Sequence, residues 1–216
     1  MNGKTIELKD AQGKLFRAYV SLPRGGCGPG VVMGLDIHGF RKLYFDLADH
    51  FAEQGYLTFV PDCFWDAKPG EDGSYKKTVN FATCVETTRC SMAAVKAMPE
   101  CNGRIGVTGF CMGGNTAFLG AARYGADAAA SYYGTRIHTF LDETRNIRKP
   151  VLLHIVEHDP TYSDENRDKI LAAVKDNPLI TTHVYAAPHG FAGTSYTPEV
   201  ANLAHARTFE LFNSLK

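Results

Sequence analysis

The chain has 216 residues, of which 44% are hydrophobic and 21% are charged, and this composition is typical of one globular domain and excludes a disordered chain. Lysine plus arginine number 23, as do aspartate plus glutamate, so the formal net charge is zero and the pI is near 7.1. Because no overall positive field would attract a polyanion, we expect no nucleic-acid partner.

The N-terminal segment and the cysteines bear on the cellular compartment. The opening stretch MNGKTIELKDAQGKLF lacks the apolar core of a signal peptide, and no apolar run is long enough to span a membrane. The six cysteines include no C-x-x-C pair, which argues against a zinc site. We therefore expect a cytoplasmic protein with reduced thiols, no metal, no cofactor and no membrane association.

The predicted elements begin with an antiparallel hairpin and continue as an alternation of strands and helices. Two short strands, 5–8 and 15–22, flank a break that contains Gly13. Apolar runs then predict strands, and residues spaced three and four apart predict helices. The strands are 30–37, 56–60, 104–108, 128–133, 151–156 and 179–185, and the helices are 43–52, 78–98, 115–124, 164–174 and 199–215. This alternation predicts a mostly parallel sheet with helices on both faces, and no linker divides residues 1–216, so we expect one α/β domain.

A cysteine stands in a glycine-rich turn between the strand 104–108 and the following helix. The run Gly109-Phe110-Cys111-Met112-Gly113-Gly114 has the small-residue spacing of the G-x-S-x-G nucleophile elbow. In that turn the nucleophile adopts a strained backbone, so its neighbours two positions away must lack bulk. The alternative is a buried cysteine in an ordinary turn, since cysteine is a small residue that is often buried. The strand and helix on either side favour the elbow.

Two residues after later strands complete a candidate triad with Cys111. Asp159 follows the strand 151–156, and His189 follows the strand 179–185. A thiol nucleophile needs a base, and the base needs a group that fixes its tautomer. Ligands bind at the carboxyl edge of such sheets, and the order nucleophile, acid, histidine is that of α/β-hydrolase triads. The sequence therefore predicts a Cys111-Asp159-His189 triad.

Each of these residues also has a simpler interpretation. Asp159 could begin a turn with Pro160, and His189 could serve only its own loop. His154 lies inside a predicted strand and is expected to be a core residue, whereas His158 competes for a role because it adjoins Asp159. Three residues that each follow their own strand, in the order of a triad, favour the catalytic interpretation.

With these motifs in place, the sequence resembles the dienelactone hydrolase family of the α/β-hydrolases, whose nucleophile is a cysteine. The resemblance spans most of the chain and is carried by the segments 35–39, 47–56, 103–114, 132–134, 154–159 and 189–191. It implies the α/β-hydrolase fold and hydrolysis of small esters or lactones, of the carboxymethylenebutenolidase type, through an acyl-thioester on Cys111. A small-molecule substrate and a monomer or small homo-oligomer are expected.

The resemblance also implies roles for residues around the triad. Asp36 stands where the family has an acidic residue, usually glutamate, that helps to deprotonate the thiol when substrate arrives. The backbone N–H groups of Ile37 and Met112 would form the oxyanion hole. The residues expected to contact substrate are His38, Tyr133, Arg136 and Phe191.

The sequence departs from the family at the arginines that hold the carboxylate of dienelactone. Residues 62–84 contain lysines but no arginine, and Gly193 stands where a second arginine is expected after His189. Lysine does not reproduce the bidentate arginine fork, so we expect a different acyl substrate, small and uncharged or weakly charged. Arg41 or Arg136 could replace the missing groups.

Two other functions are compatible with the same residues. The triad could serve a thioesterase or a peptidase. Alternatively, the protein could be a non-catalytic sensor in which Cys111 is reversibly oxidised.

Overall fold

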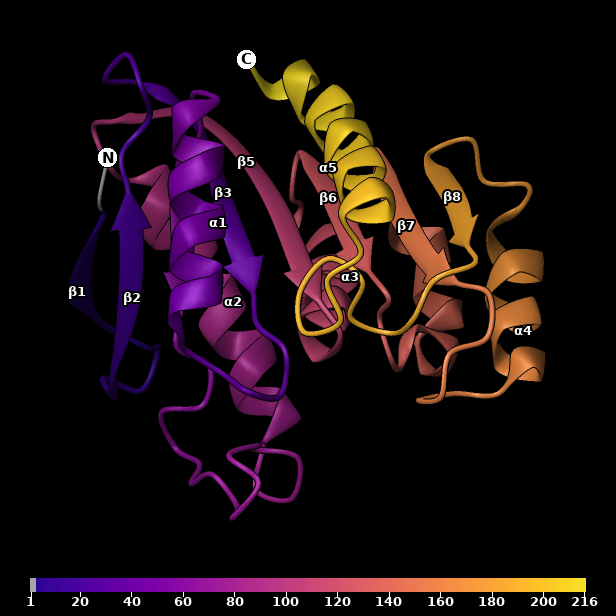
Figure 1. Ribbon diagram of the computed structural model, residues 1–216. Helices are drawn as coiled ribbons and strands as arrows, with labels where there is room; N and C mark the ends of the chain where they lie inside the picture. The colour runs from indigo at the N-terminus through magenta and orange to yellow at the C-terminus, as the bar shows by residue number, and fades with distance from the viewer. Residues whose placement is uncertain (1–2) are drawn as a thin grey trace.

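The computed structural model describes residues 3–216, in which eight strands form one sheet (Figure 1). The order across the sheet is β1-β2-β4-β3-β5-β6-β7-β8. β1 pairs antiparallel with β2 and β2 antiparallel with β4, whereas all other neighbours are parallel. This confirms the predicted mostly parallel sheet with an N-terminal antiparallel hairpin. The strands are β1 (Lys4–Lys9), β2 (Leu15–Ser21), β3 (Gly28–Gly34), β4 (Leu57–Pro61), β5 (Cys101–Phe110), β6 (Ala128–Tyr132), β7 (Val151–Val156) and β8 (Ile180–Tyr185).

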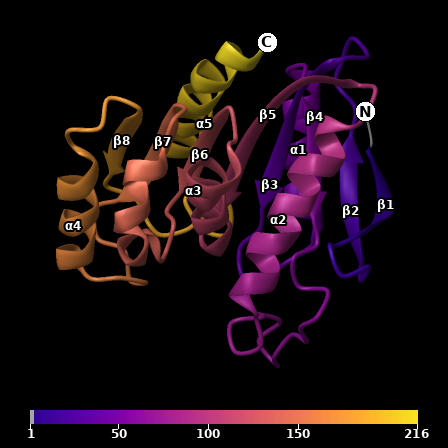
Figure 2. The ribbon, with the colours of Figure 1, turned by 180° about the vertical axis from the view of Figure 1, so that it is seen from behind.

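Helices cover both faces of the sheet. The helices α1 (Lys42–Glu53) and α5 (Pro198–Phe212) lie on one face, and α2 (Phe81–Lys96), α3 (Met112–Tyr124) and α4 (Asp164–Val174) lie on the other (Figures 1 and 2). Successive side chains of β3 point to opposite faces of the sheet, and this shows why the central strands are apolar throughout. Val31 and Met33 join the core under α1 and α5, while Val32 joins the core under α2 and α3. A strand buried on both faces needs apolar residues at consecutive positions.

The strand predicted over 30–37 ends earlier, at Gly34. Beyond it the carbonyl of Leu35 accepts a hydrogen bond from the N–H of Gly113, at 2.9 Å, instead of continuing the ladder with β5. A Cβ on Gly34 would crowd the backbone of Gly113, so the close approach depends on both glycines. The chain therefore leaves the sheet at Leu35 and carries the next residues over the start of α3.

Other boundaries differ from the prediction at caps and short helices. α2 begins at Phe81 rather than at 78, because the Asn80 side chain accepts the N–H of Ala82 and caps the helix. Three short 3-10 helices, η1 (Ile137–Thr139), η2 (Leu141–Asn146) and η3 (Asn213–Leu215), have no periodic signal and were not predicted as separate elements. None of the helices within residues 3–216 has the length and apolar character needed to cross a bilayer.

Candidate active site

Cys111 sits at the sharp junction between β5 and α3 with a strained backbone. Its φ of 57° and ψ of −115° lie in a region that non-glycine residues rarely adopt. Its N–H donates to the carbonyl of Tyr132 at 3.0 Å, which fixes the turn against β6. A Cβ on Gly109 would overlap the carbonyl of Gly113, and a Cβ on Gly113 would overlap Gly34. The glycines around Cys111 are thus required by close backbone packing, as the elbow spacing predicts.

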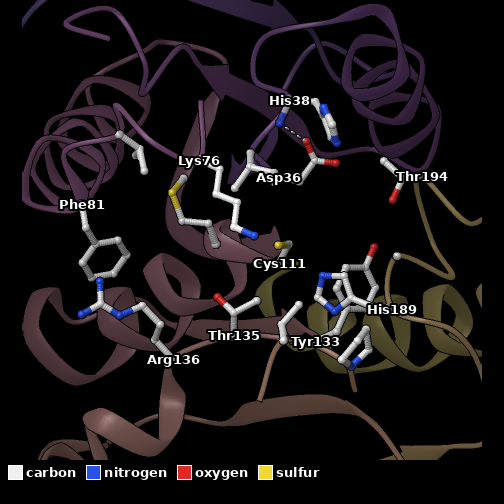
Figure 3. Close-up of a pocket in the computed structure, with 16 residues that line it drawn as sticks. Asp36, His38, Lys76, Phe81, Cys111, Tyr133, Thr135, Arg136, His189 and Thr194 are labelled. Carbon is white, nitrogen blue, oxygen red and sulfur yellow. Dashed lines mark hydrogen bonds between the residues drawn. The ribbon is translucent and has the colours of Figure 1, made fainter. Parts of the chain in front are cut away.

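His189 and Asp159 form a short hydrogen bond after β8 and β7. The distance from His189 Nδ1 to Asp159 Oδ2 is 2.6 Å, and the Asp159 side chain is fully buried, with 0% exposure. The other oxygen of Asp159 accepts the N–H of Thr161 at 2.8 Å and its hydroxyl at 2.5 Å. A carboxylate can only accept, so Nδ1 carries a proton and Nε2 is left for the pocket, where His189 lies beside Cys111 (Figure 3).

The surroundings raise the pKa of His189 and lower the pKa of Asp159, so both partners favour their charged forms. Burial lowers the pKa of His189, but the hydrogen bond to Asp159 and the interactions with Cys111 outweigh it and raise this pKa to about 9. For Asp159, burial raises the pKa, but the hydrogen bonds from His189 and Thr161 outweigh it and hold the pKa below its usual range. An imidazolium is therefore favoured at neutral pH, which suits a thiolate on Cys111.

The carboxylate of Asp36 is engaged on the side of the site away from His189. Oδ1 accepts the N–H of His38 at 2.8 Å, and Oδ2 accepts from the guanidinium of Arg41 at 2.5 Å. Within residues 3–216, neither oxygen of Asp36 is hydrogen-bonded to the thiol of Cys111. To reach the sulfur, the carboxylate would have to leave Arg41. The activating role implied for Asp36 stays a prediction.

Tyr133 is a buried phenol that lines the cavity and packs against the histidine. Its φ is 40°, its exposure is 2%, and its ring packs edge-on against His189 with centroids 4.9 Å apart. Burial raises the pKa of Tyr133 well above its usual range, and the negative charges of Asp36 and Cys111 raise it further. The hydroxyl therefore stays protonated and can only be a neutral donor or acceptor.

The predicted residues meet at a cavity of about 660 Å³ (Figure 3). Of the residues singled out from the sequence, those that line it are Asp36, Ile37, His38, Cys111, Met112, Tyr133, Arg136 and His189. Asp159 lies behind His189. Phe191 is a correction, because it is fully buried, packs against the rings of Tyr133 and Tyr185, and is not among the cavity-lining residues. It packs behind the ring of Tyr133, so we do not expect it to contact substrate.

Sequence reasoning missed part of the cavity wall. The added residues are Lys76, Val79, Phe81, Thr135, Pro160, Thr161, Gly190 and Thr194. Thr161 had a usable signal, since a threonine two residues after an aspartate is typical of a turn in which the aspartate accepts its N–H. Lys76 and Val79 lie in the long connection between β4 and α2, which has no periodic pattern.

The two other histidines weighed from the sequence, His154 and His158, do not line this cavity. His154 is buried in β7 and bonds Tyr185 through Nδ1, at 2.8 Å, and Thr208 through Nε2, at 3.0 Å, so it is the core residue that was predicted. His158 is exposed and pairs with Asp164 at 3.0 Å. In the part of the chain that the structure describes, no three His, Cys, Asp or Glu side chains are grouped to hold a metal ion.

Comparison with known proteins places these features in a family. The sequence pattern of the dienelactone hydrolase family matches residues 16–216. A relative from Azospirillum brasilense is 38% identical, with 91% of this chain and 92% of its own length covered. A carboxymethylenebutenolidase from Pseudomonas sp. (strain P51) is 30% identical, with 99% and 95% covered.

Solved structures share the fold across the whole chain. A dienelactone hydrolase-like promiscuous phosphotriesterase from metagenomic libraries superposes with a TM-score of 0.82 at 20% identity, and 100% of this chain and 99% of that chain are covered. A dienelactone hydrolase from Anabaena variabilis superposes with a TM-score of 0.75 at 14% identity, with 100% and 99% covered. The fold is therefore that of the α/β-hydrolases, and the chain belongs to the dienelactone hydrolase family.

Proposed function

We propose that this protein hydrolyses small carboxylic esters or lactones with a Cys111-His189-Asp159 triad, as a carboxymethylenebutenolidase-type enzyme. The observation that carries the proposal is the 2.6 Å hydrogen bond from His189 to the buried Asp159, formed at the cavity that also exposes the strained Cys111. A buried acid, an oriented imidazole and a thiol at a helix start are the parts that nucleophilic acyl transfer needs.

The first half of the reaction forms a thioester. The thiolate sulfur of Cys111 attacks the carbonyl carbon, and the electron pair of the C=O bond moves onto its oxygen. The N–H groups of Ile37 and Met112, both at the cavity wall, donate to this oxyanion. When the tetrahedral intermediate collapses, the ester C–O bond breaks and His189 gives its Nε2 proton to the leaving alkoxide. For a lactone, the new hydroxyl stays attached to the acyl group.

The second half releases the acid. His189, now neutral, takes a proton from a water molecule whose oxygen attacks the thioester carbonyl. The second intermediate collapses, the C–S bond breaks, and Cys111 leaves as a thiolate beside the regenerated imidazolium. Asp159 keeps the ring in the tautomer that each step needs and stabilises its positive charge.

Asp36 would act before this cycle. We infer that substrate draws the Asp36 carboxylate from Arg41, after which it can take the proton of a Cys111 thiol. The raised pKa of His189 supports a second route, in which the resting pair is already imidazolium and thiolate. The rate of thiol alkylation in the resting enzyme separates the two routes.

The remaining expectations stay predictions. A thioesterase or peptidase would use the same triad, and a redox sensor would use Cys111 alone. We also propose that the enzyme is a single domain, that it is cytoplasmic, and that it is a monomer or a small homo-oligomer.

A panel of chromogenic short-chain esters and small lactones tests the proposal. We expect turnover by the wild type and none above background by Cys111→Ala at matched folded concentration, checked by circular dichroism. Peroxide labelling of Cys111 without any ester, lactone or thioester turnover would favour the sensor instead.

A further inference from the structure

A buried threonine hydroxyl on α5 joins the side chains of two neighbouring strands. Thr208 Oγ1 lies 2.6 Å from the hydroxyl of Tyr132, the last residue of β6, and 3.0 Å from Nε2 of His154 on β7. Tyr132 and His154 are paired across the two strands, and their ring centroids are 4.3 Å apart. All three residues are at most 1% exposed, so water does not compete for these bonds. We call Thr208, Tyr132 and His154 the buried hub.

The hub is part of one directed chain of hydrogen bonds. The carbonyl of Ala204 can only accept, so the hydroxyl of Tyr132 donates to it at 3.2 Å. Thr208 must then donate to Tyr132, and the Nε2–H of His154 must donate to Thr208. Burial lowers the pKa of His154 well below its usual range, so its ring is neutral and Nδ1 accepts from the hydroxyl of Tyr185 at 2.8 Å. Each side chain of the hub is therefore fixed by a bond that it donates and one that it accepts.

The two strand residues of the hub also hold two strained residues of the site. The carbonyl of Tyr132 accepts the N–H of Cys111 at 3.0 Å, and the carbonyl of His154 accepts the N–H of Tyr133 at 2.7 Å. Within residues 3–216, Cys111 and Tyr133 are the two non-glycine residues with a positive φ, at 57° and 40°. Such conformations persist only where the surrounding structure over-determines them. The hub is one source of that constraint.

The far end of the chain supports the histidine of the triad. The hydroxyl of Tyr185 accepts from Arg207 Nη1 at 3.0 Å, which holds its ring in place. The ring of Tyr185 packs on Phe191 with centroids 5.1 Å apart, and Phe191 packs on Tyr133 at 5.2 Å. Tyr133 in turn packs against His189 at 4.9 Å. The hub thus reaches the nucleophile through the backbone and the base through packed rings.

We propose that Thr208 is a positioning residue, whose hydroxyl ties the ends of β6 and β7 to α5 and keeps Cys111 and His189 in the geometry that acyl transfer needs. The catalytic part of this inference rests on the proposed ester hydrolase. Thr208 is not among the residues that line the cavity, so it acts through Tyr132 and His154. A small displacement is enough, because a misplacement of about 1 Å can slow a reaction by about 10²-fold.

Thr208→Val tests the hydroxyl, since valine has nearly the same size but forms no side-chain hydrogen bond. We expect kcat for a chromogenic ester to fall by about tenfold, as two ordinary hydrogen bonds are lost, with KM within about twofold of wild type. Thr208→Ser keeps the hydroxyl and should restore most of kcat. The matched control is Thr88→Val on α2, where the buried hydroxyl donates to the carbonyl of Cys84 in its own helix at 2.9 Å. This control should keep the wild-type kcat.

A second readout does not depend on turnover. Iodoacetamide labelling of resting Cys111, followed by peptide mapping across a pH series, gives the pH of half-maximal labelling. This pH reports how well the His189 imidazolium and the start of α3 stabilise the thiolate. It should rise by about half a unit in Thr208→Val and return toward the wild-type value in Thr208→Ser. If Thr208→Val does not fold, Tyr132→Phe removes the other end of the 2.6 Å bond and takes its place.

The outcomes separate the positioning role from a structural one and from the hydrolase. A folded Thr208→Val with the wild-type kcat and labelling pH overturns the proposal. Equal losses in Thr208→Val and Thr208→Ser, or the same loss in Thr88→Val, overturn it too, because the hydroxyl of Thr208 would then not be the cause. If the wild type hydrolyses esters no faster than Cys111→Ala, the proposed function fails, and the labelling pH still decides whether Thr208 positions Cys111.

Discussion

The two walls of the cavity hold their charges differently. On the triad wall each carboxylate has a positive partner, since Asp159 binds His189 and Asp36 binds Arg41. On the facing wall the backbone N–H of Arg136 is bonded to Asn115 and its guanidinium lies over Phe81, while the exposed Lys76 lines the cavity without a carboxylate partner among residues 3–216. Paired charges hold catalytic groups in one geometry, whereas an uncompensated charge favours a ligand of opposite sign. In the proposed function, the chemistry takes place at the first wall.

The largest effect is expected when the nucleophile is removed from the triad wall. Cys111→Ala should lower kcat by at least about 10⁴-fold, and His189→Asn should do the same, because groups that act as a unit lose most of their effect together. Steady-state kinetics on one neutral ester measures this, with thermal melts as the folding control. Wild-type turnover in a folded Cys111→Ala would assign the chemistry elsewhere.

The second largest effect on kcat is expected from changing Asp159, the partner of His189. Asp159→Asn keeps the shape but offers Nδ1 a group that can also donate, so the wrong tautomer becomes accessible and kcat should fall by about 10³- to 10⁴-fold. The same change removes the hydrogen bond that raises the pKa of His189. If ester hydrolysis in this variant stayed within a few-fold of wild type, the 2.6 Å bond would have only a structural role.

A smaller effect should follow from changing the second acid. We expect Asp36→Asn to lower ester turnover, by about 10²-fold if Asp36 is the base for the thiol, because the amide cannot accept the proton. Iodoacetamide labelling of resting Cys111 should be faster or unchanged, since a negative charge near the thiol disfavours the thiolate. Turnover at the wild-type rate in this variant would mean that Asp36 has only a structural role. The reaction would then start from the resting imidazolium–thiolate pair.

The pH dependence tests the charge state on the triad wall. The pKa of His189 is raised to about 9, so an active imidazolium–thiolate pair should lose kcat/KM as the pH rises through about 9. Removing the Asp159 carboxylate should move this alkaline limb to lower pH, because the positive ring loses its partner. If the alkaline limb of the kcat/KM profile stays at the same pH in Asp159→Asn, the group that titrates there is not His189.

The raised pKa of His189 also predicts a modest pH dependence of the stability of the fold. A histidine whose pKa rises from 6.5 in the unfolded chain to about 9 in the folded protein stabilises it fully below 6.5, and this stabilisation is lost as the pH rises through about 9. The Tm of the wild type should therefore fall more between pH 6 and pH 9.5 than the Tm of His189→Gln. Parallel pH profiles of Tm in the two proteins would contradict the assignment.

The three residues of the proposed triad can be picked out from the sequence because each follows a local rule. Cys111 is marked by glycine spacing, and Asp159 and His189 are marked by their positions just after apolar strands. Each signal depends on a few neighbouring residues, and the parallel sheet brings them to one edge. The resemblance to the family added Asp36, Ile37 and other cavity-lining residues.

The facing wall could not be predicted in the same way. Lys76 lies in a connection without periodicity, and only the bond from Tyr75 to Ile37 brings it to the cavity. Arg136 was chosen from the sequence, but its packing on Phe81 depends on two segments that are distant in the chain. Phe191 was misplaced because an aromatic residue after a catalytic histidine can point into the core as easily as into the site.

The central claim is that Cys111 carries the acyl group during turnover. Rapid acid quench of the wild type with a chromogenic ester, followed by intact-protein mass spectrometry and peptide mapping, tests it directly. We predict a mass increase of one acyl group per chain, mapped to the peptide that contains Cys111 and missing from Cys111→Ala. Ester turnover with no adduct on Cys111 at any quench time, and with activity retained in Cys111→Ala, would contradict the account.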